Sequence, residues 1–323
     1  MVNLRRDLAA GGIFFLYGSL RLLPRSAAVL LCRALGRAAW VLDGSGRSVT
    51  LSNLEGAFGE ELGQDRRKAV GSATYVNLAA NLADLSRLTR LSGEELCSLV
   101  AADEESFGRL EDAVSLGRGV ILLTPHLGNW ELLAAYLANS GLKVHFVGRE
   151  PYDRRLDSLF KAVRTSHGAL WMSRGGAFEK LREVLGQGDL AILLIDQDTG
   201  RVKGTFVEFF GEQAWTPTGP AALARLMGSA MIPCALVRQP DNTYRLIIET
   251  SLQTVKTGDE EYDDWENTRR ASLAIESLVA RYPEQWTWFH RRWRTRPPDD
   301  WVMPGPPRTA ARLESPSPVE GKP

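Results

Sequence analysis

The stretch VILLTPHLGNWELLAAYLA, residues 120–138, is the most informative about the fold, because a strand pattern is followed by a helix pattern within it. The run VILLT is apolar, partly β-branched and bounded by Gly119 and Pro125, so it predicts a short buried strand. A helix is predicted over 130–138, and the turn-forming sequence NSG ends it. The turn between strand and helix holds His126, one of four histidines in the chain.

The alternation of strand and helix continues beyond this stretch. Further strands are predicted over 144–148, 169–172, 190–195, 231–237 and, with an antiparallel character, 243–249; helices are predicted over 152–166, 177–185, 219–228 and 265–281. Residues 50–118 have a helical pattern with loops near Gly63 and Gly93. Such alternation implies parallel strands joined by right-handed crossovers. The sequence therefore predicts an α/β fold, with a mainly parallel sheet and helices on both faces.

The composition is that of a globular protein, with 44% hydrophobic and 24% charged residues in a chain of 323. Basic and acidic residues number 39 each, which gives no reason to expect nucleic acid as a partner. The cysteines Cys32, Cys97 and Cys234 are too far apart for a metal knuckle, which fits a reducing compartment. Motifs for a serine nucleophile elbow, a zinc protease and a phosphate loop are missing from the sequence, so no metal is predicted.

The first 48 residues combine apolar runs with arginines. The run 8–20 is apolar but has two glycines in its middle, and no uncharged run reaches the roughly 18 to 20 residues of a spanning helix. We predict helices that lie on a membrane surface, with apolar sides in the acyl boundary and arginines at anionic head groups. A signal-peptide core and ordinary helices packed on the domain are the alternatives. Residues 304–323 are proline-rich and predicted to be disordered.

His126 and Glu131 are the residues best placed for acid–base chemistry. On a continuous helix a separation of five would point them to different faces, so they can meet only if His126 lies in the turn. Gly128 and the helix-capping Asn129 favour that geometry. We predict that Glu131 fixes one imidazole nitrogen, that the other takes a proton, and that amides of the helix start stabilise an oxyanion. A polar loop histidine without a catalytic role is the alternative.

Arginines and strand-end polar residues supply the substrate-site candidates. Arginine binds phosphate with two parallel hydrogen bonds, which suits a lipid or carrier phosphate; a solvated helix face is the alternative for most of them. Asp196 is predicted either to accept hydrogen bonds from acceptor hydroxyls or to be a turn residue. The predicted substrate-binding residues are Arg149, Arg164, Arg174, Asp196 and Gln197.

A phenylalanine cluster and an arginine-rich segment are two further candidates for substrate contacts. The rings of Phe206, Phe209 and Phe210 are candidates for an acyl slot or, alternatively, for the core. The segment HRRWRTRP, residues 290–297, is interpreted as a contact to a head group or carrier rather than as a catalytic element.

Five motifs in order along the chain carry a resemblance to a known family. They are LLTPHLGNWELLAAYLA, SRGGAFEKL, LLIDQDTG, GTFVEFFGEQAWTPTGPAALARLMGSAMIPCALVR and YPEQWTWFHRRWRTRP. Together they resemble the bacterial lipid A biosynthesis acyltransferases, the late lauroyl and myristoyl transferases, within the wider glycerolipid acyltransferases that have an H-x4-D/E motif. The resemblance runs from about residue 1 to residue 300 and extends to mycobacterial phosphatidylinositol mannoside acyltransferases.

The resemblance implies a glycerolipid acyltransferase-like fold and transfer of an acyl chain to a hydroxyl. His126 would be the general base and Glu131 its orienting partner, with direct attack and no covalent intermediate. The implied donor is an acyl carrier protein or coenzyme A thioester, with no other cofactor, and the implied acceptor is a phosphoglycolipid, foremost a lipid A precursor. Phosphatidylinositol mannoside as acceptor, and a non-catalytic lipid-binding protein of the same fold, are the alternatives.

The resemblance also implies a location and a domain plan. The cytoplasmic face of the bacterial inner membrane is the expected location, with peripheral attachment or a short N-terminal anchor. The expected domains are membrane-associated helices over 1–48, an acyltransferase domain over 49–303 and the tail over 304–323.

Overall fold

The computed structural model describes residues 2–148, 154–200 and 202–307 of the chain. In this part of the chain seven strands form one sheet, in the order β1-β9-β8-β2-β5-β3-β4. The strands are β1 (Val100–Ala101), β2 (Val120–Leu123), β3 (Val144–Gly148), β4 (Leu170–Ser173), β5 (Leu190–Leu193), β8 (Ala230–Arg238) and β9 (Tyr244–Ile248). Only β8 and β9 pair antiparallel within this sheet. The mainly parallel sheet and the antiparallel strand over 243–249 are therefore confirmed.

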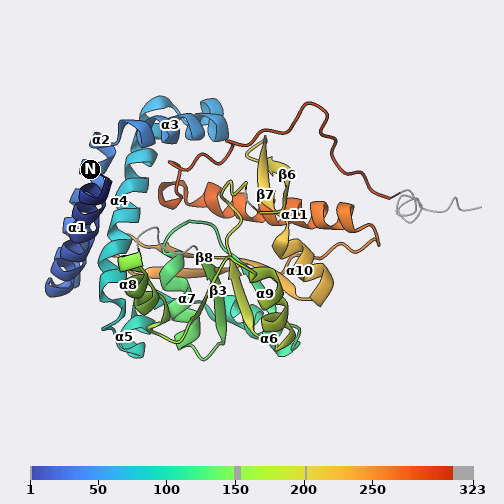
Figure 1. Ribbon diagram of the computed structural model, residues 1–323, viewed down its shortest axis with the longest axis horizontal. Helices are drawn as coiled ribbons and strands as arrows, with labels where there is room; N and C mark the ends of the chain where they lie inside the picture. The colour runs from blue at the N-terminus through green and yellow to red at the C-terminus, as the bar shows by residue number, and fades with distance from the viewer. Residues whose placement is uncertain (1, 149–153, 201, 308–323) are drawn as a thin grey trace, which may run out of the picture.

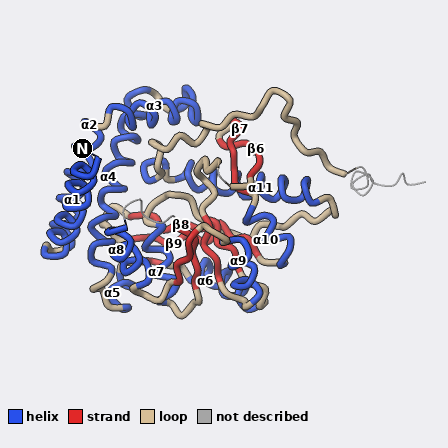
Figure 2. Tube along the Cα trace, viewed as in Figure 1, coloured by secondary structure: helices blue, strands red, loops and turns tan. Residues whose placement is uncertain are grey.

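Helices cover both faces of the sheet (Figures 1 and 2). Alternate side chains of β2 point to opposite faces, so Val120 and Leu122 belong to one core cluster and Ile121 and Leu123 to the other. The first face carries α5 (Gly93–Ser98), α6 (Glu104–Ser115), α7 (Trp130–Asn139) and α8 (Arg154–Thr165); the second carries α9 (Ala177–Gly186), α10 (Gly219–Met227) and α11 (Glu260–Arg281). The predicted helices on both faces are confirmed.

The strand order brings distant parts of the chain together. β5 pairs on one side with β2 and on the other with β3, so it lies between two strands that follow each other in the sequence. Parallel strands end at the same edge of a sheet. The segment after β2, which holds His126, and the segment after β5, which holds Asp196, therefore become neighbours.

The N-terminal helices form a layer of their own beside the sheet (Figure 1). They are α1 (Val2–Leu22), α2 (Arg25–Leu42), α3 (Gly44–Phe58) and α4 (Gln64–Leu88). Leu20, Val29 and Cys32 pack against Ala80 and Ala83 of α4 in a separate small core. α3 runs across the domain boundary expected at residue 48. Within the described ranges, no helix has the length and apolar character needed to cross a bilayer.

A β-hairpin was not among the predicted elements. It consists of β6 (Gly204–Phe209) and β7 (Glu212–Pro217), joined by Phe210 and Gly211. Both linking residues have positive φ angles, 52° and 74°, as a two-residue hairpin turn of the primed type requires. Phe206 and Phe209 are buried, and the Phe209 ring lies 5.6 Å from that of Trp286, so both phenylalanines belong to the core.

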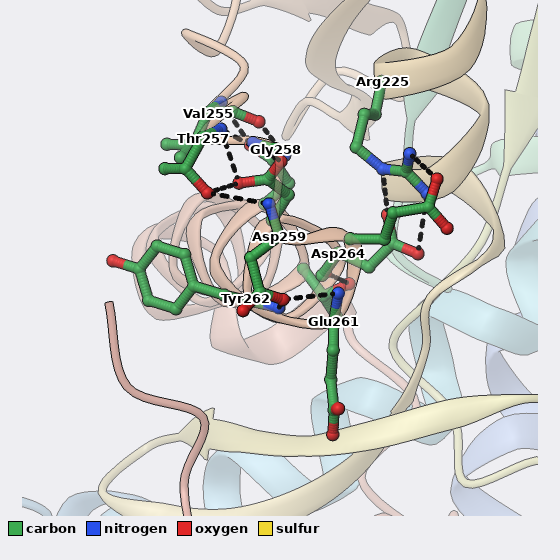
Figure 3. A network of polar contacts seen from close by, with 12 residues as sticks. Arg225, Val255, Thr257, Gly258, Asp259, Glu261, Tyr262 and Asp264 are labelled. Atoms are coloured by element: carbon green, nitrogen blue, oxygen red, sulfur yellow. Dashed lines mark hydrogen bonds and ion pairs between the residues drawn. The ribbon is translucent and has the colours of Figure 1, made fainter. Parts of the chain in front are cut away.

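Helix α11 starts at Glu260, five residues before the predicted start, because a polar network fixes its first turn (Figure 3). Asp259 accepts hydrogen bonds from the amides of Glu261 and Tyr262, each at 3.1 Å. Arg225 of α10 donates to Asp264 at 2.8 Å and so ties the two helices together. After α11 the chain continues as residues 282–296, which we call the C-terminal strap; Trp286 of this segment pairs with Leu127 in the loop after β2. Residues 308–323, most of the predicted tail, lie outside the described part.

Candidate active site

The loop from Thr124 to Asn129 is shaped by close packing against β8. Gly128 has a φ of +61°, and a Cβ there would lie 2.0 Å from the carbonyl oxygen of Leu236. Its amide donates to the carbonyl of Gln285 at 3.1 Å, and its carbonyl accepts from Nδ2 of Asn81 at 2.6 Å. Asn129 caps α7 by accepting from the amide of Leu132 at 3.2 Å. Gly128 and Asn129 therefore fix the backbone of the loop that carries His126.

Replacing Gly128 by alanine is expected to lower the free energy of unfolding by about 3 kcal/mol or more and to abolish any reaction at His126. The added methyl group meets backbone, which cannot move aside, and it adds the strain of a positive φ. Chemical denaturation measures this loss. Gly117→Ala is the matched control: Gly117 has a φ of +65° but open space around it, so only the backbone strain of about 1 kcal/mol is expected. Equal losses in the two variants would contradict the packing argument.

His126 is held by Asp196, not by Glu131. Nδ1 of His126 lies 2.8 Å from Oδ1 of Asp196, and the His126 amide donates to Oδ2 at 2.7 Å. Oδ2 also accepts from Nε1 of Trp286 in the C-terminal strap, at 2.7 Å. The predicted assignment of Glu131 as orienting partner is corrected here, and so is the assignment of Asp196 to acceptor hydroxyls. The reason is the strand order, which puts the ends of β2 and β5 side by side.

The charge on Asp196 follows from these contacts. Burial alone would raise the pKa of Asp196, but the charge and hydrogen bonds of His126, with the hydrogen bond from Trp286, outweigh it and hold the pKa below its usual value. An ionised carboxylate can only accept hydrogen bonds. Nδ1 of His126 must therefore carry the proton that it shares with Asp196. In the neutral form of the imidazole, Nε2 is then the unprotonated nitrogen and is able to accept a proton.

Glu131 forms a bidentate ion pair with Arg164 of α8. Nε of Arg164 donates to Oε2 at 2.9 Å, and Nη2 donates to Oε1 at 2.6 Å. The guanidinium also lies over the rings of Phe146 and Phe160, 5.9 and 5.5 Å from their centroids. Glu131 thus sits in the first turn of α7, as predicted, but its carboxylate fixes an arginine. A phosphate-binding role for Arg164 stays a prediction.

The other predicted substrate residues fall in different places. Arg149 lies outside the described residues. Arg174 is exposed in the turn after β4, and Gln197 is half-buried directly after Asp196. The amides of Gly128 and Asn129 are bonded to the carbonyls of Gln285 and Leu236. The amides of Trp130 and Glu131 have no acceptor within the described ranges and so remain the candidates for an oxyanion site.

Three residues of the C-terminal strap contribute to the site in ways that the sequence did not indicate. Besides the indole of Trp286, the ring of His290 lies near enough to interact with the charges of Asp196 and His126; burial lowers the pKa of His290 to about 4, although Asp196 opposes this. Arg292 is 1% exposed and donates to the backbone carbonyl of Trp215 and to Oγ1 of Thr216. Arg292 is therefore not part of the head-group or carrier contact predicted for residues 290–297, which stays a prediction for the rest of that segment. The only signal in the sequence was the high tryptophan content of the segment.

The geometry does not support Cys234 as a nucleophile. Cys234 lies in β8 with 1% exposure, and burial raises the pKa of its thiol to about 12. A thiol of this kind is protonated and inert near neutral pH. In the described part of the chain, His126 with Asp196 therefore remains the candidate reactive group.

Comparison with known proteins places these features in a family. The family model described as bacterial lipid A biosynthesis acyltransferase matches residues 5–295. A lipid A biosynthesis myristoyltransferase of Escherichia coli is 25% identical over 277 residues, 86% of this chain and 84% of that protein. The palmitoleoyltransferase of the same organism is 35% identical over 122 residues, which is 36% of this chain and only 38% of the relative. A phosphatidylinositol mannoside acyltransferase of Mycolicibacterium smegmatis is 27% identical over 229 residues, 67% of this chain and 72% of that protein.

Proposed function

Because the chain belongs to the bacterial lipid A biosynthesis acyltransferase family and is an acyltransferase, we propose that it transfers a fatty acyl chain from a thioester to a hydroxyl of a lipid A precursor or a related glycolipid. The observation that supports this reaction most is the hydrogen bond of 2.8 Å between Nδ1 of His126 and Asp196. It leaves Nε2 as the base that an alcohol nucleophile needs.

The reaction then runs without a covalent intermediate on the protein. Nε2 of His126 removes the proton of the acceptor hydroxyl as its oxygen attacks the thioester carbonyl, so a carbon–oxygen bond forms. The resulting imidazolium is stabilised by the carboxylate of Asp196. When the carbon–sulfur bond breaks, the same proton passes to the leaving thiolate. The amides of Trp130 and Glu131 are the proposed donors to the oxyanion, since the first turn of a helix favours negative charge.

The proposed partners are a thioester donor, as acyl carrier protein or coenzyme A, and a phosphorylated glycolipid acceptor. Arg164 is the proposed phosphate ligand: Nε and Nη2 are bound by Glu131, and this fixes the direction of Nη1. Arg174, Gln197 and Arg149 stay in the proposed substrate site. A phosphatidylinositol mannoside acceptor is the second candidate, because a relative of that name matches 67% of the chain.

We also propose that α1 and α2 lie on a membrane at the cytoplasmic face. One side of this helix pair packs on α4, while its large apolar side chains Phe15, Leu22, Leu30 and Leu42 are 78%, 81%, 68% and 83% exposed. So many exposed apolar side chains on one layer of helices are suited to insertion at the boundary between lipid head groups and acyl chains. The arginines of α2 would then contact the head groups.

Replacing Phe15 and Leu30 together by serine is expected to weaken binding to vesicles that contain anionic lipid by about 10³-fold, because each buried side chain contributes about 2 kcal/mol and each 1.4 kcal/mol is about a factor of ten. Vesicle sedimentation measures the binding. Leu116→Ser is the matched control, since Leu116 is 67% exposed but lies at the end of α6, away from the N-terminal layer. If the double variant and the control bound equally well, the helices would not be the membrane contact.

Incubation of the purified chain and membranes with a labelled acyl thioester tests the proposed reaction. The label is expected in a glycolipid ester, and mass spectrometry of that lipid identifies the acceptor and the chain length. Absence of labelled lipid with every acyl donor would support the non-catalytic alternative, a lipid-binding protein with the same fold.

A further inference from the structure

A recess lies between α3 and the end of the C-terminal strap. Its volume is about 640 Å³, within the range of pockets that bind small molecules. One wall is α3, through Ser52 and Asn53, and the opposite wall is the end of the strap, through Arg291, Trp293, Arg294 and Arg296. No step of the proposed reaction uses these side chains.

The charge of this recess, which we call the strap pocket, is positive. Arg294 lies 3.3 Å from Asp198, and Arg296 lies 2.6 Å from Glu212. These carboxylates hold the two guanidinium groups from one side, and the side chains are still 59% and 61% exposed. Arg291 is exposed and has no ion pair with any residue in the described ranges. Glu55, the other carboxylate of the lining, is paired with Arg67 at 2.6 Å. A mobile anion would therefore meet uncompensated positive charge.

The strap connects this pocket to the reacting centre. Thr295 donates its amide to Asp198 at 2.7 Å, and Trp286 at the other end donates to Asp196, two residues earlier in the chain. Asn53 donates to the carbonyls of Trp288 and His290 at 2.7 and 2.8 Å. The pocket wall is thus built on the same segments that hold the catalytic pair. The two ends of the strap are thus bonded to carboxylates only two positions apart in the chain.

We propose that the strap pocket binds a phosphate ester, and that it is the phosphate of the donor's phosphopantetheine arm, which acyl carrier protein and coenzyme A share. This inference rests on the proposed acyl transfer. Guanidinium groups match phosphate oxygens in a bidentate geometry, and three of them line this pocket. The large exposed apolar side chains of α1 and α2 do not line it, so it is separate from the proposed membrane contact. A phosphopantetheine arm keeps its phosphate well away from the thioester sulfur, so the two groups could bind at the two ends of the strap.

Two small donors that differ only in the phosphate test this site directly: S-acyl-4′-phosphopantetheine and S-acyl-pantetheine. With the full chain and a fixed acceptor, KM is expected to be about 10-fold lower for the donor that has the phosphate. Arg291→Gln is expected to remove most of this difference and to leave kcat and the KM of S-acyl-pantetheine unchanged. Arg245→Gln, an exposed arginine of β9, is the matched control and is expected to keep the difference.

The remaining outcomes separate the possibilities. If Arg291→Gln raises the KM of the acceptor instead, the pocket binds a head-group phosphate and the donor assignment is overturned. Equal KM values for both donors in the unmodified chain, with no effect of Arg291→Gln on either substrate, would overturn the phosphate site altogether. If neither donor is used, the chain is titrated with 4′-phosphopantetheine. Binding that Arg291→Gln weakens would support the strap pocket while the proposed acyl transfer fails. Absence of binding would overturn both the strap pocket and the proposed acyl transfer.

Discussion

His126→Gln is expected to reduce the rate of acyl transfer by at least about 10³-fold, because it removes the only proposed proton acceptor for the attacking hydroxyl. Glutamine keeps the size and polarity of the side chain and can still donate to Asp196, so the fold should persist. Single-turnover transfer of a labelled acyl chain measures the chemical step without product release. The affinity for the acceptor is expected to fall less than the rate of transfer, because Nε2 acts mainly during the reaction.

The chain offers a matched control for this variant. Nε2 of His145 lies 2.9 Å from Asp189, which makes a second histidine–carboxylate pair. Asp189 directly precedes β5, whereas Asp196 follows it, so the two pairs lie at opposite ends of the same strand. His145→Gln is expected to keep the transfer rate within about 2-fold, because Asp189 and His145 are far from the carboxyl edge. Equal losses in the two variants would mean that the histidine at the carboxyl edge has no special role.

Asp196→Asn is expected to give a folded protein whose transfer rate is about 10³- to 10⁴-fold lower. Oδ2 of Asp196 accepts hydrogen bonds from the His126 amide and from Trp286, and both of these groups can only donate. The oxygen of an asparagine must therefore take this position. Its NH₂ group would then point at Nδ1 of His126 and donate to it, so the proton of the imidazole would move to Nε2. The base would be lost although every hydrogen bond is replaced.

Circular dichroism and thermal unfolding check that the Asp196→Asn protein is folded, and single-turnover transfer gives the rate. Asp189→Asn is the control, since it makes the same chemical change beside His145 at the other end of β5. Full activity of Asp196→Asn would show that the tautomer of His126 does not matter for the reaction. Loss of the fold, by contrast, would mean that the charge of Asp196 is needed for packing.

Much of the fold could be predicted from local patterns. The apolar runs around β2, β3 and β5 and the helices between them are each short, regular and bounded by glycine or proline, so their type is visible in the sequence. The order of the strands is not a local property. The position of β5 between β2 and β3 depends on how the whole sheet packs, and no residue pattern within β5 predicts it. The β6–β7 hairpin was missed because its turn is Phe210–Gly211, and a phenylalanine at positive φ is unusual.

The same limit explains the error in the candidate site. His126 and Glu131 are close in sequence, so their spacing predicts a pair, and Glu131 does stand in the first turn of α7. Its side chain meets Arg164, which comes from another helix. Asp196 was recognised only as a polar residue at a strand end, because its contact with His126 spans 70 positions. Trp286 was missed for the same reason, and a buried indole has no sequence signal that separates a hydrogen-bond donor from a core residue.

Single-turnover transfer of a labelled acyl chain by Asp196→Asn and by Glu131→Gln is the most direct test of whether Asp196, and not Glu131, holds His126 for catalysis. Both variants remove one negative charge beside the same turn, but only Asp196 contacts the imidazole. We expect a loss of about 10³-fold or more for Asp196→Asn and a loss at least about 10-fold smaller for Glu131→Gln. A Glu131→Gln protein that loses the reaction while Asp196→Asn retains it would contradict the assignment of Asp196 as the residue that holds His126 for catalysis.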